Sequence, residues 1–216
     1  MKRFPLTNAD SYSVKYRHGE KVYATLELNQ VAFPKTGMVV SQTPLGAEFT
    51  PEAPCENGMW VVADKAAGVI ASPAAATDKP IGIVYTTEKE YDVFHYGLQT
   101  FGRKIAGDYP RVGILGIGDT VTTNCLQYDD TTDFPAVTTT GSEKTSDEVL
   151  DNYLSGDLTN TNKAYVIIPA STTLSKAIPQ IVKSLPNGYT GAYGRIVKYY
   201  TVPNGEKGVK YQIVRV

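Results

Sequence analysis

Residues 111–124 read RVGILGIGDTVTTN, and this stretch fits one of two structures: a glycine-rich phosphate loop or two β-strands joined by a turn. A phosphate loop directs consecutive backbone N–H groups at the anion, at the start of a helix. Here Gly113, Gly116 and Gly118 stand in the reverse of the dinucleotide spacing, and no Gly-Lys-Ser/Thr follows. Residues 120–123 are all β-branched, and residues 119–124 lack a helical apolar period. The stretch therefore predicts strand, turn, strand.

The same pattern of short strands extends over the first 128 residues. Lys21 to Leu28 alternates apolar and polar side chains, and it is expected to pair with residues 12–16 across the turn 17–20. Further short strands, separated by turn residues, are predicted at 37–41, 58–63, 69–72, 81–86, 112–117 and 119–127. This spacing favours a sandwich or small barrel over parallel βαβ units.

The chain changes character at residues 129–144, DDTTDFPAVTTTGSEK, a polar connection rich in threonine. A capping box at Thr145 and Glu148 predicts a helix whose end Gly156 closes. A second helix, limited by Pro179, is expected from the apolar spacing of residues 174–185. A hairpin with a turn at residues 203–205 closes the chain, and a strand is expected at 165–168.

The predicted fold is mainly β, a β-dominated α+β class. It has a small barrel or sandwich core, one or two helices and a closing C-terminal hairpin. Residues 1–128 form the β-rich core domain, 129–144 a polar linker and 145–216 a helix-plus-hairpin section. Whether that last section packs on the core as one domain is left open by the sequence.

Charge is balanced overall, with 21 basic and 22 acidic residues, so composition gives no argument for nucleic acid. The distribution is uneven. Basic residues gather near both ends of the chain, whereas residues 129–157 hold eight acidic residues and one lysine. Solvated loops are one interpretation; the other is that unlike regions of neighbouring molecules meet in an array.

No reactive constellation stands out. Cys55 and Cys125 have no partner at a metal-binding spacing, and both thiols are expected to be free. His18 falls in a predicted turn and His95 among aromatic residues, where packing is the better explanation. We therefore expect no catalytic residue, no metal and no cofactor.

Two groups of acidic residues are candidate sites. Glu88, Glu90 and Asp92 would share one face of a strand and could serve as a glycosidase pair, but alternating charge is also typical of an exposed edge strand. The group of Asp129, Asp130 and Asp133 could hold calcium, yet it lacks the glycine and distal glutamate of an EF-hand loop. An edge strand and a solvated loop are the preferred interpretations.

Residues 57–86, NGMWVVADKAAGVIASPAAATDKPIGIVYT, carry a family resemblance: short strands, small turns, an alanine-rich spacer and then Pro-Ile-Gly-Ile-Val. This pattern resembles the small β-barrel of tailed-phage head decoration (cement) proteins. YPRVGILGIGDTVTTNCLQYD, ending at Asp129, is similar to the strands of phage structural proteins more widely. The likeness covers roughly residues 57–128. The region after Asp129 departs from the compact decoration-protein pattern.

The resemblance implies a non-enzymatic virion structural protein, a capsid decoration or auxiliary head protein, with partners among the major capsid protein or other virion proteins. It implies a homo-oligomer on the particle and no contact with nucleic acid or membrane. The chain shows no signal peptide and no apolar run long enough for a membrane helix, so synthesis in a host cytoplasm is expected. The alternatives are a carbohydrate-binding or host-receptor-binding β module and, third, a glycoside hydrolase using Glu88 and Glu90.

Overall fold

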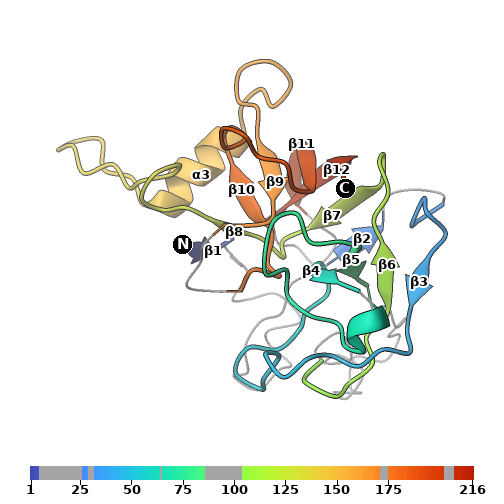
Figure 1. The fold of residues 1–216 in the computed structure, drawn as a ribbon. Helices are drawn as coiled ribbons and strands as arrows, with labels where there is room; N and C mark the ends of the chain where they lie inside the picture. The colour runs from blue at the N-terminus through green and yellow to red at the C-terminus, as the bar shows by residue number, and fades with distance from the viewer. Residues whose placement is uncertain (5–25, 29–31, 64, 86–103, 171–174, 202–206) are drawn as a thin grey trace, which may run out of the picture.

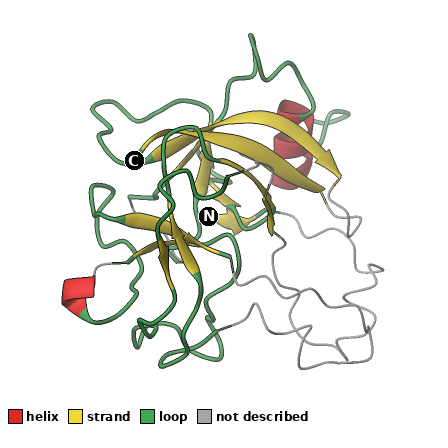
Figure 2. Ribbon diagram, turned by 90° about the vertical axis from the view of Figure 1, so that its right-hand side faces the viewer, coloured by secondary structure: helices red, strands yellow, loops and turns green. Residues whose placement is uncertain are grey.

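The structure, a computed structural model, describes residues 1–4, 26–28, 32–63, 65–85, 104–170, 175–201 and 207–216. Within these ranges it holds two β-sheets, one α-helix and one short 3-10 helix, η1 (Lys65–Ala67). The predicted class, mainly β with few helices, is therefore confirmed. Figure 2 shows the larger sheet lying above the smaller one, with the helix to one side.

The larger sheet has eight strands, and it takes them from both sides of the polar connection at 129–144. In spatial order they are β1 (Lys2–Arg3), β8 (Gln127–Tyr128), β10 (Gln180–Val182), β9 (Tyr165–Ile167), β11 (Tyr193–Thr201), β12 (Lys207–Arg215), β7 (Thr120–Thr123) and β2 (Leu26–Leu28). All neighbours are antiparallel except β8 and β10, which are parallel.

This sheet curls back on itself without closing into a barrel. Strands β7 and β8 are separated by four strands in the sheet, yet only residues 124–126 join them along the chain. Because a residue spans at most about 3.6 Å, the ends of β7 and β8 lie within roughly 14 Å of each other. The main hydrophobic core contains side chains of this curled sheet, such as Val121, together with others from the smaller sheet and the helix, such as Trp60 and Leu150.

The smaller sheet has four antiparallel strands. In spatial order they are β3 (Val39–Val40), β6 (Val112–Ile114), β5 (Ile81–Val84) and β4 (Trp60–Val62). Its side chains alternate between two clusters: Trp60, Ile81 and Ile83 join the main core, whereas Val61 and Val84 join a second core. Both faces of β4 and β5 are thus buried, which explains their nearly continuous apolar sequences.

The opening stretch connects the two sheets. Strand β6 belongs to the smaller sheet and β7 to the larger, so the turn at residues 115–119 carries the chain from one to the other. The Asp119 carboxylate is fully buried and accepts hydrogen bonds from the backbone N–H groups of Gly116 (2.7 Å) and Lys35 (2.9 Å). The predicted strand, turn and strand are confirmed, and no helix follows the glycines.

A second link joins the sheets inside the main core. Trp60 on β4 and Tyr211 on β12 are both fully buried, and the indole Nε1–H donates to the Tyr211 hydroxyl at 3.0 Å. Their rings also meet edge to face, with centroids 6.0 Å apart. Burial raises the pKa of Tyr211, so this hydroxyl stays protonated and neutral.

The helix α3 (Ser146–Leu154) begins as the sequence predicts. The Thr145 hydroxyl accepts from the Glu148 N–H, and the Glu148 carboxylate accepts from the Thr145 N–H, which completes the capping box. At its end Ser155 is the C-cap and the predicted Gly156 follows directly, although without a positive φ. Any larger residue at position 156 would clash, because a Cβ there would lie 2.2 Å from the side-chain amide nitrogen of Asn162. That nitrogen donates to the Tyr153 carbonyl.

The second predicted helix is wrong, because residues 180–182 form strand β10. Gln180 pairs with both Gln127 and Ile167, so β10 lies between β8 and β9. A strand with neighbours on both edges and burial on both faces shows no alternation of polar and apolar residues. Its apolar spacing can therefore be mistaken for that of a helix.

Other strand predictions hold in part. The predicted strand 119–127 is divided into β7 and β8, and 69–72 forms only isolated bridges, from Ile70 to Leu45 and from Ala71 to Val62. The C-terminal hairpin is confirmed as β11 and β12, although its turn lies outside the described residues. So does the expected partner strand at 12–16, and of 21–28 only β2 is described.

The turn between the sheets yields a stability prediction. Gly118 has φ +89°, a conformation that side chains disfavour, whereas Gly116 has ordinary φ and would place a Cβ 3.2 Å from a Thr36 methyl group. Gly118→Ala should lower the free energy of unfolding by about 1 kcal/mol or more, and Gly116→Ala by less. Urea denaturation measures both. Equal stability of Gly118→Ala and wild type would contradict the role given to this turn.

Candidate functional site

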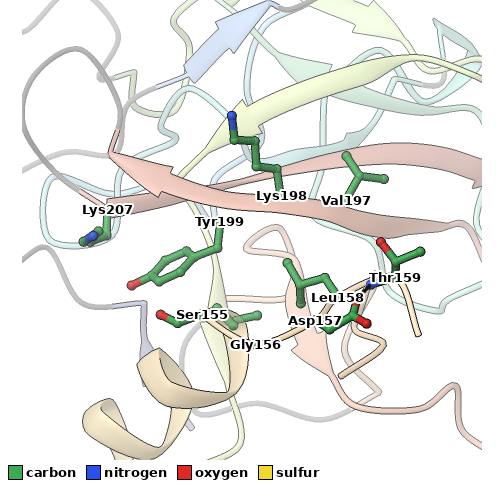
Figure 3. A pocket seen from close by; sticks show the side chains of 10 residues that line it. Ser155, Gly156, Asp157, Leu158, Thr159, Val197, Lys198, Tyr199 and Lys207 are labelled. Atoms are coloured by element: carbon green, nitrogen blue, oxygen red, sulfur yellow. Dashed lines mark hydrogen bonds between the residues drawn. The ribbon is translucent and has the colours of Figure 1, made fainter. Parts of the chain in front are cut away.

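A surface cleft of about 440 Å³ lies between strand β11 and the segment that follows α3. Figure 3 shows Tyr199 reaching from β11 toward Ser155 and Gly156, whereas Lys198 points to the other side of the strand. Lys207 stands at one end, with its ammonium 5.5 Å from the centre of the Tyr199 ring. The lining residues are 154–159, 197–199 and 207.

The cleft runs beside an unpaired edge of β11. Strand β9 pairs with β11 only from Tyr193 to Arg195, and one further hydrogen bond joins Ile196 N–H to the Ala164 carbonyl. Beyond this point β11 continues to Thr201 along β12 alone. Among the described residues, no strand occupies the β9 side of β11 after Ile196.

Register shows which backbone groups face the cleft. The Ile213 N–H donates to the Asp119 carbonyl, so the backbone groups of Ile213 point toward β7. Because this direction alternates from one residue to the next in an antiparallel strand, the N–H and C=O of Val209, four residues earlier, also point toward β7. Because Val209 lies opposite Tyr199, the N–H and C=O of Tyr199 point away from β12. They point to the side on which the cleft lies, and they can accept an added strand.

A projecting hairpin, which we call the arm, occupies residues 135–144. Every residue from 135 to 145 is exposed, and Figure 1 shows the arm extending well beyond α3. Val137 and Lys144 exchange backbone hydrogen bonds of 2.8 and 2.9 Å, and Gly141 turns the chain with φ +81°. At its base the fully buried Phe134 packs edge to face against Tyr128 and Tyr153.

A third surface, which we call the β3 edge, consists of β3 and the neighbouring turn. Met38, Val39 and Ile117 are 54%, 44% and 66% exposed. The Ile114 N–H donates to the Met38 carbonyl, so by alternation the backbone N–H and C=O of Val39 point away from β6. Strand β3 ends the smaller sheet in the described structure, so these groups face outward.

Of the candidates taken from sequence, five lie outside the described residues: His18, His95, Glu88, Glu90 and Asp92. The glycosidase hypothesis therefore stays a prediction. Sequence reasoning missed the cleft and the arm. The β-branched run 137–140 followed by Gly141 is a hairpin signal that could have revealed the arm, but the cleft has no local signature, because tertiary packing forms it.

The acidic group at 129–133 forms local contacts. The Asp129 carboxylate accepts from Thr131 and Thr132, and these hydrogen bonds outweigh partial burial and lower its pKa. Asp130 pairs with the N-terminal amine at 2.9 Å, which lowers its pKa. Burial and the nearby Asp129 charge raise the pKa of Asp133. Within the described residues, no group of three His, Cys, Asp or Glu side chains could hold a metal ion.

The basic N-terminal residues and the acidic region 129–157, which are far apart in the sequence, partly meet within the folded chain. Strand β1 places the basic N-terminus beside the acidic region: Lys2 Nζ donates to the Ser146 hydroxyl at 2.8 Å, close to the Asp130 ion pair. Arg3 instead reaches the largely buried Glu56 at 3.2 Å. Unlike regions of the sequence thus meet within one chain, and this contact requires no neighbouring molecule.

Both cysteines and the tryptophan are core residues. Cys55 and Cys125 are fully buried free thiols, and burial raises the pKa of both, that of Cys125 to about 12. Trp60 is equally buried, so it offers no exposed face on which a sugar could stack. In the described part of the chain, no helix is long and apolar enough to cross a membrane.

Comparison with known proteins gives no relative. No family model matches the chain, and neither curated proteins nor solved structures gave a significant match.

The thiols give a chemical prediction. The thiolate is the reactive form of cysteine, and here both thiols are buried with raised pKa values. The folded protein should therefore show almost no reaction with a disulfide reagent at pH 8, and both cysteines should react once denaturant unfolds the chain. Absorbance of the released thiol measures this. Rapid labelling of either cysteine in the folded protein would contradict the burial.

Asp129 and Asp133 should have opposite effects on stability, because their pKa values are shifted in opposite directions. The lowered pKa of Asp129 means that its stabilising contribution is present above about pH 4 and is lost as pH falls through that pKa. The raised pKa of Asp133 means that its ionisation opposes folding at neutral pH. At pH 7, Asp129→Asn should lower the melting temperature and Asp133→Asn should raise it. At pH 3 both differences should shrink; shifts of the same sign at pH 7 would refute this assignment.

Proposed function

We propose that the chain is a non-enzymatic virion structural protein, a capsid decoration or auxiliary head protein that binds the major capsid protein or another lattice protein. Support comes first from the β3 edge. Three large apolar side chains, Met38, Val39 and Ile117, are more than two-fifths exposed on the edge strand and its adjoining turn. An exposed apolar edge promotes unwanted association unless a partner covers it.

The geometry of the β3 edge fits a strand-pairing contact. The outward N–H and C=O of Val39 can bond to an extended segment of the partner, while Met38 and Ile117 add apolar contact area. One such contact is small. On a repeating lattice, however, several such contacts act together. Once one contact holds a copy near the lattice, its second contact forms at a high effective concentration, so the overall affinity rises. Modest edges of this kind suit a protein that covers a lattice.

The resemblance of residues 57–86 to decoration proteins gives independent support. The Pro-Ile-Gly-Ile-Val element of that resemblance is strand β5 with the proline before it, and β5 lies between β4 and β6 inside the smaller sheet. The resembling segment thus belongs to the sheet that carries the β3 edge, with β6 between β5 and β3. The charged region 129–133, in contrast, forms contacts within its own chain.

Cosedimentation with decoration-free capsid particles tests the proposal. Val39→Lys places a charge on the β3 edge and should weaken binding by about tenfold or more, which corresponds to about 1.4 kcal/mol. Val214→Lys is the matched control, because Val214 is 40% exposed on β12, in the other sheet. It should bind as wild type does. Because the expected contact is apolar, salt should change binding little.

The two ways of failing have different meanings. Equal binding by wild type and Val39→Lys would show that another surface makes the contact. Absence of wild-type binding to every particle tested would overturn the virion function itself.

A further inference from the structure

In the described part of the chain, the arm and the portion of β11 beside the cleft both present backbone edges with no partner strand. In the arm, Val137 and Lys144 form a hydrogen-bonded pair, so the backbone groups of Ala136 and Thr138 point away from the second strand of the hairpin. In the cleft, the N–H and C=O of Tyr199 point away from β12. Each surface therefore offers both a donor and an acceptor with which the backbone of the other can pair.

Shape and charge also agree. A strand added to β11 would lie about 4.8 Å from it, on the side where β9 has ended and the cleft of about 440 Å³ opens. The cleft carries Lys207 at one end and Asp157 on the facing segment. The arm carries the neighbouring pair Glu143 and Lys144, both exposed. Opposite charges are thus available on both sides of the contact.

The arm does not fill the cleft of its own chain. It enters α3 at Thr145, the N-cap, whereas the cleft begins at Leu154, at the far end of that helix. Figure 1 shows the arm projecting away from the sheets rather than back along α3. The arm is exposed along its whole length, so the arm of a second copy can reach this cleft.

We infer that the arm of one copy adds as a β-strand to the free edge of β11 in the cleft of the next copy. The arm and the cleft are different surfaces, so the contact is heterologous: it closes into a ring or continues as a chain of molecules. This inference deepens the proposed structural function by naming the contact between neighbouring copies. It leaves the β3 edge free to face the lattice.

Sedimentation in the absence of particles tests the inference, so its outcome is independent of whether the lattice is found. The mass of wild type should rise with concentration up to about 100 µM, the range of a modest single interface. Thr138→Pro removes the N–H that pairs outward, and Ser155→Trp fills the cleft. Each variant should stay monomeric over the same range. Thr138→Ala and Ser155→Ala, the matched controls, keep the backbone groups and the space and should assemble as wild type does.

Mixing the two defective variants gives the decisive result. Thr138→Pro keeps an open cleft and Ser155→Trp keeps an intact arm, so an equimolar mixture should form a dimer of one copy each and nothing larger. Circular dichroism and urea denaturation confirm that both variants are folded. A wild type that is monomeric throughout, a Thr138→Pro variant that assembles normally, or a mixture that stays monomeric would each overturn the inference.

Discussion

The buried carboxylate of Asp119 is the contact on which the arrangement of the two sheets depends. It accepts from the Gly116 and Lys35 N–H groups, so one side chain fixes the turn between β6 and β7 and also the segment that leads into β3. A buried acceptor of this kind is costly to remove, since the buried Gly116 N–H and the Lys35 N–H would then both lose their partner. This turn determines where β7 starts. Because β12 and β2 both pair with β7, the turn also influences where those two strands lie.

The fold that follows uses its polar residues mainly for internal support. Trp60 and Tyr211 join the sheets within the core, and Arg3 and Glu56 form an ion pair between β1 and the turn before β4. Asp130 and Lys2 tie strand β1 to the acidic region. These groups would be natural candidates for a site if judged by residue type alone. In the structure their partners lie within the same chain.

Among the described residues, the surfaces that we assign to interaction with other molecules present backbone groups rather than reactive side chains. The β3 edge, the free part of β11 and the arm each expose strand hydrogen-bonding groups together with β-branched or apolar side chains. Two of these surfaces complement each other, and the third is apolar and faces outward. Such a distribution fits assembly, in which many weak contacts act together.

The sequence by itself determined the local structure where local physics suffices. The capping box fixed the start of α3, the β-branched runs fixed β11 and β12, and the order of glycines in 111–124 excluded a phosphate loop. It failed at β10, because burial on all sides removes the alternation by which a strand is recognised. It also missed the cleft and the free edge of β11, since these exist only because β9 is shorter than β11 and α3 ends nearby. Only the tertiary structure decides which edges are left unpaired, because pairing depends on strands far apart in the chain, and no local pattern records their relative lengths.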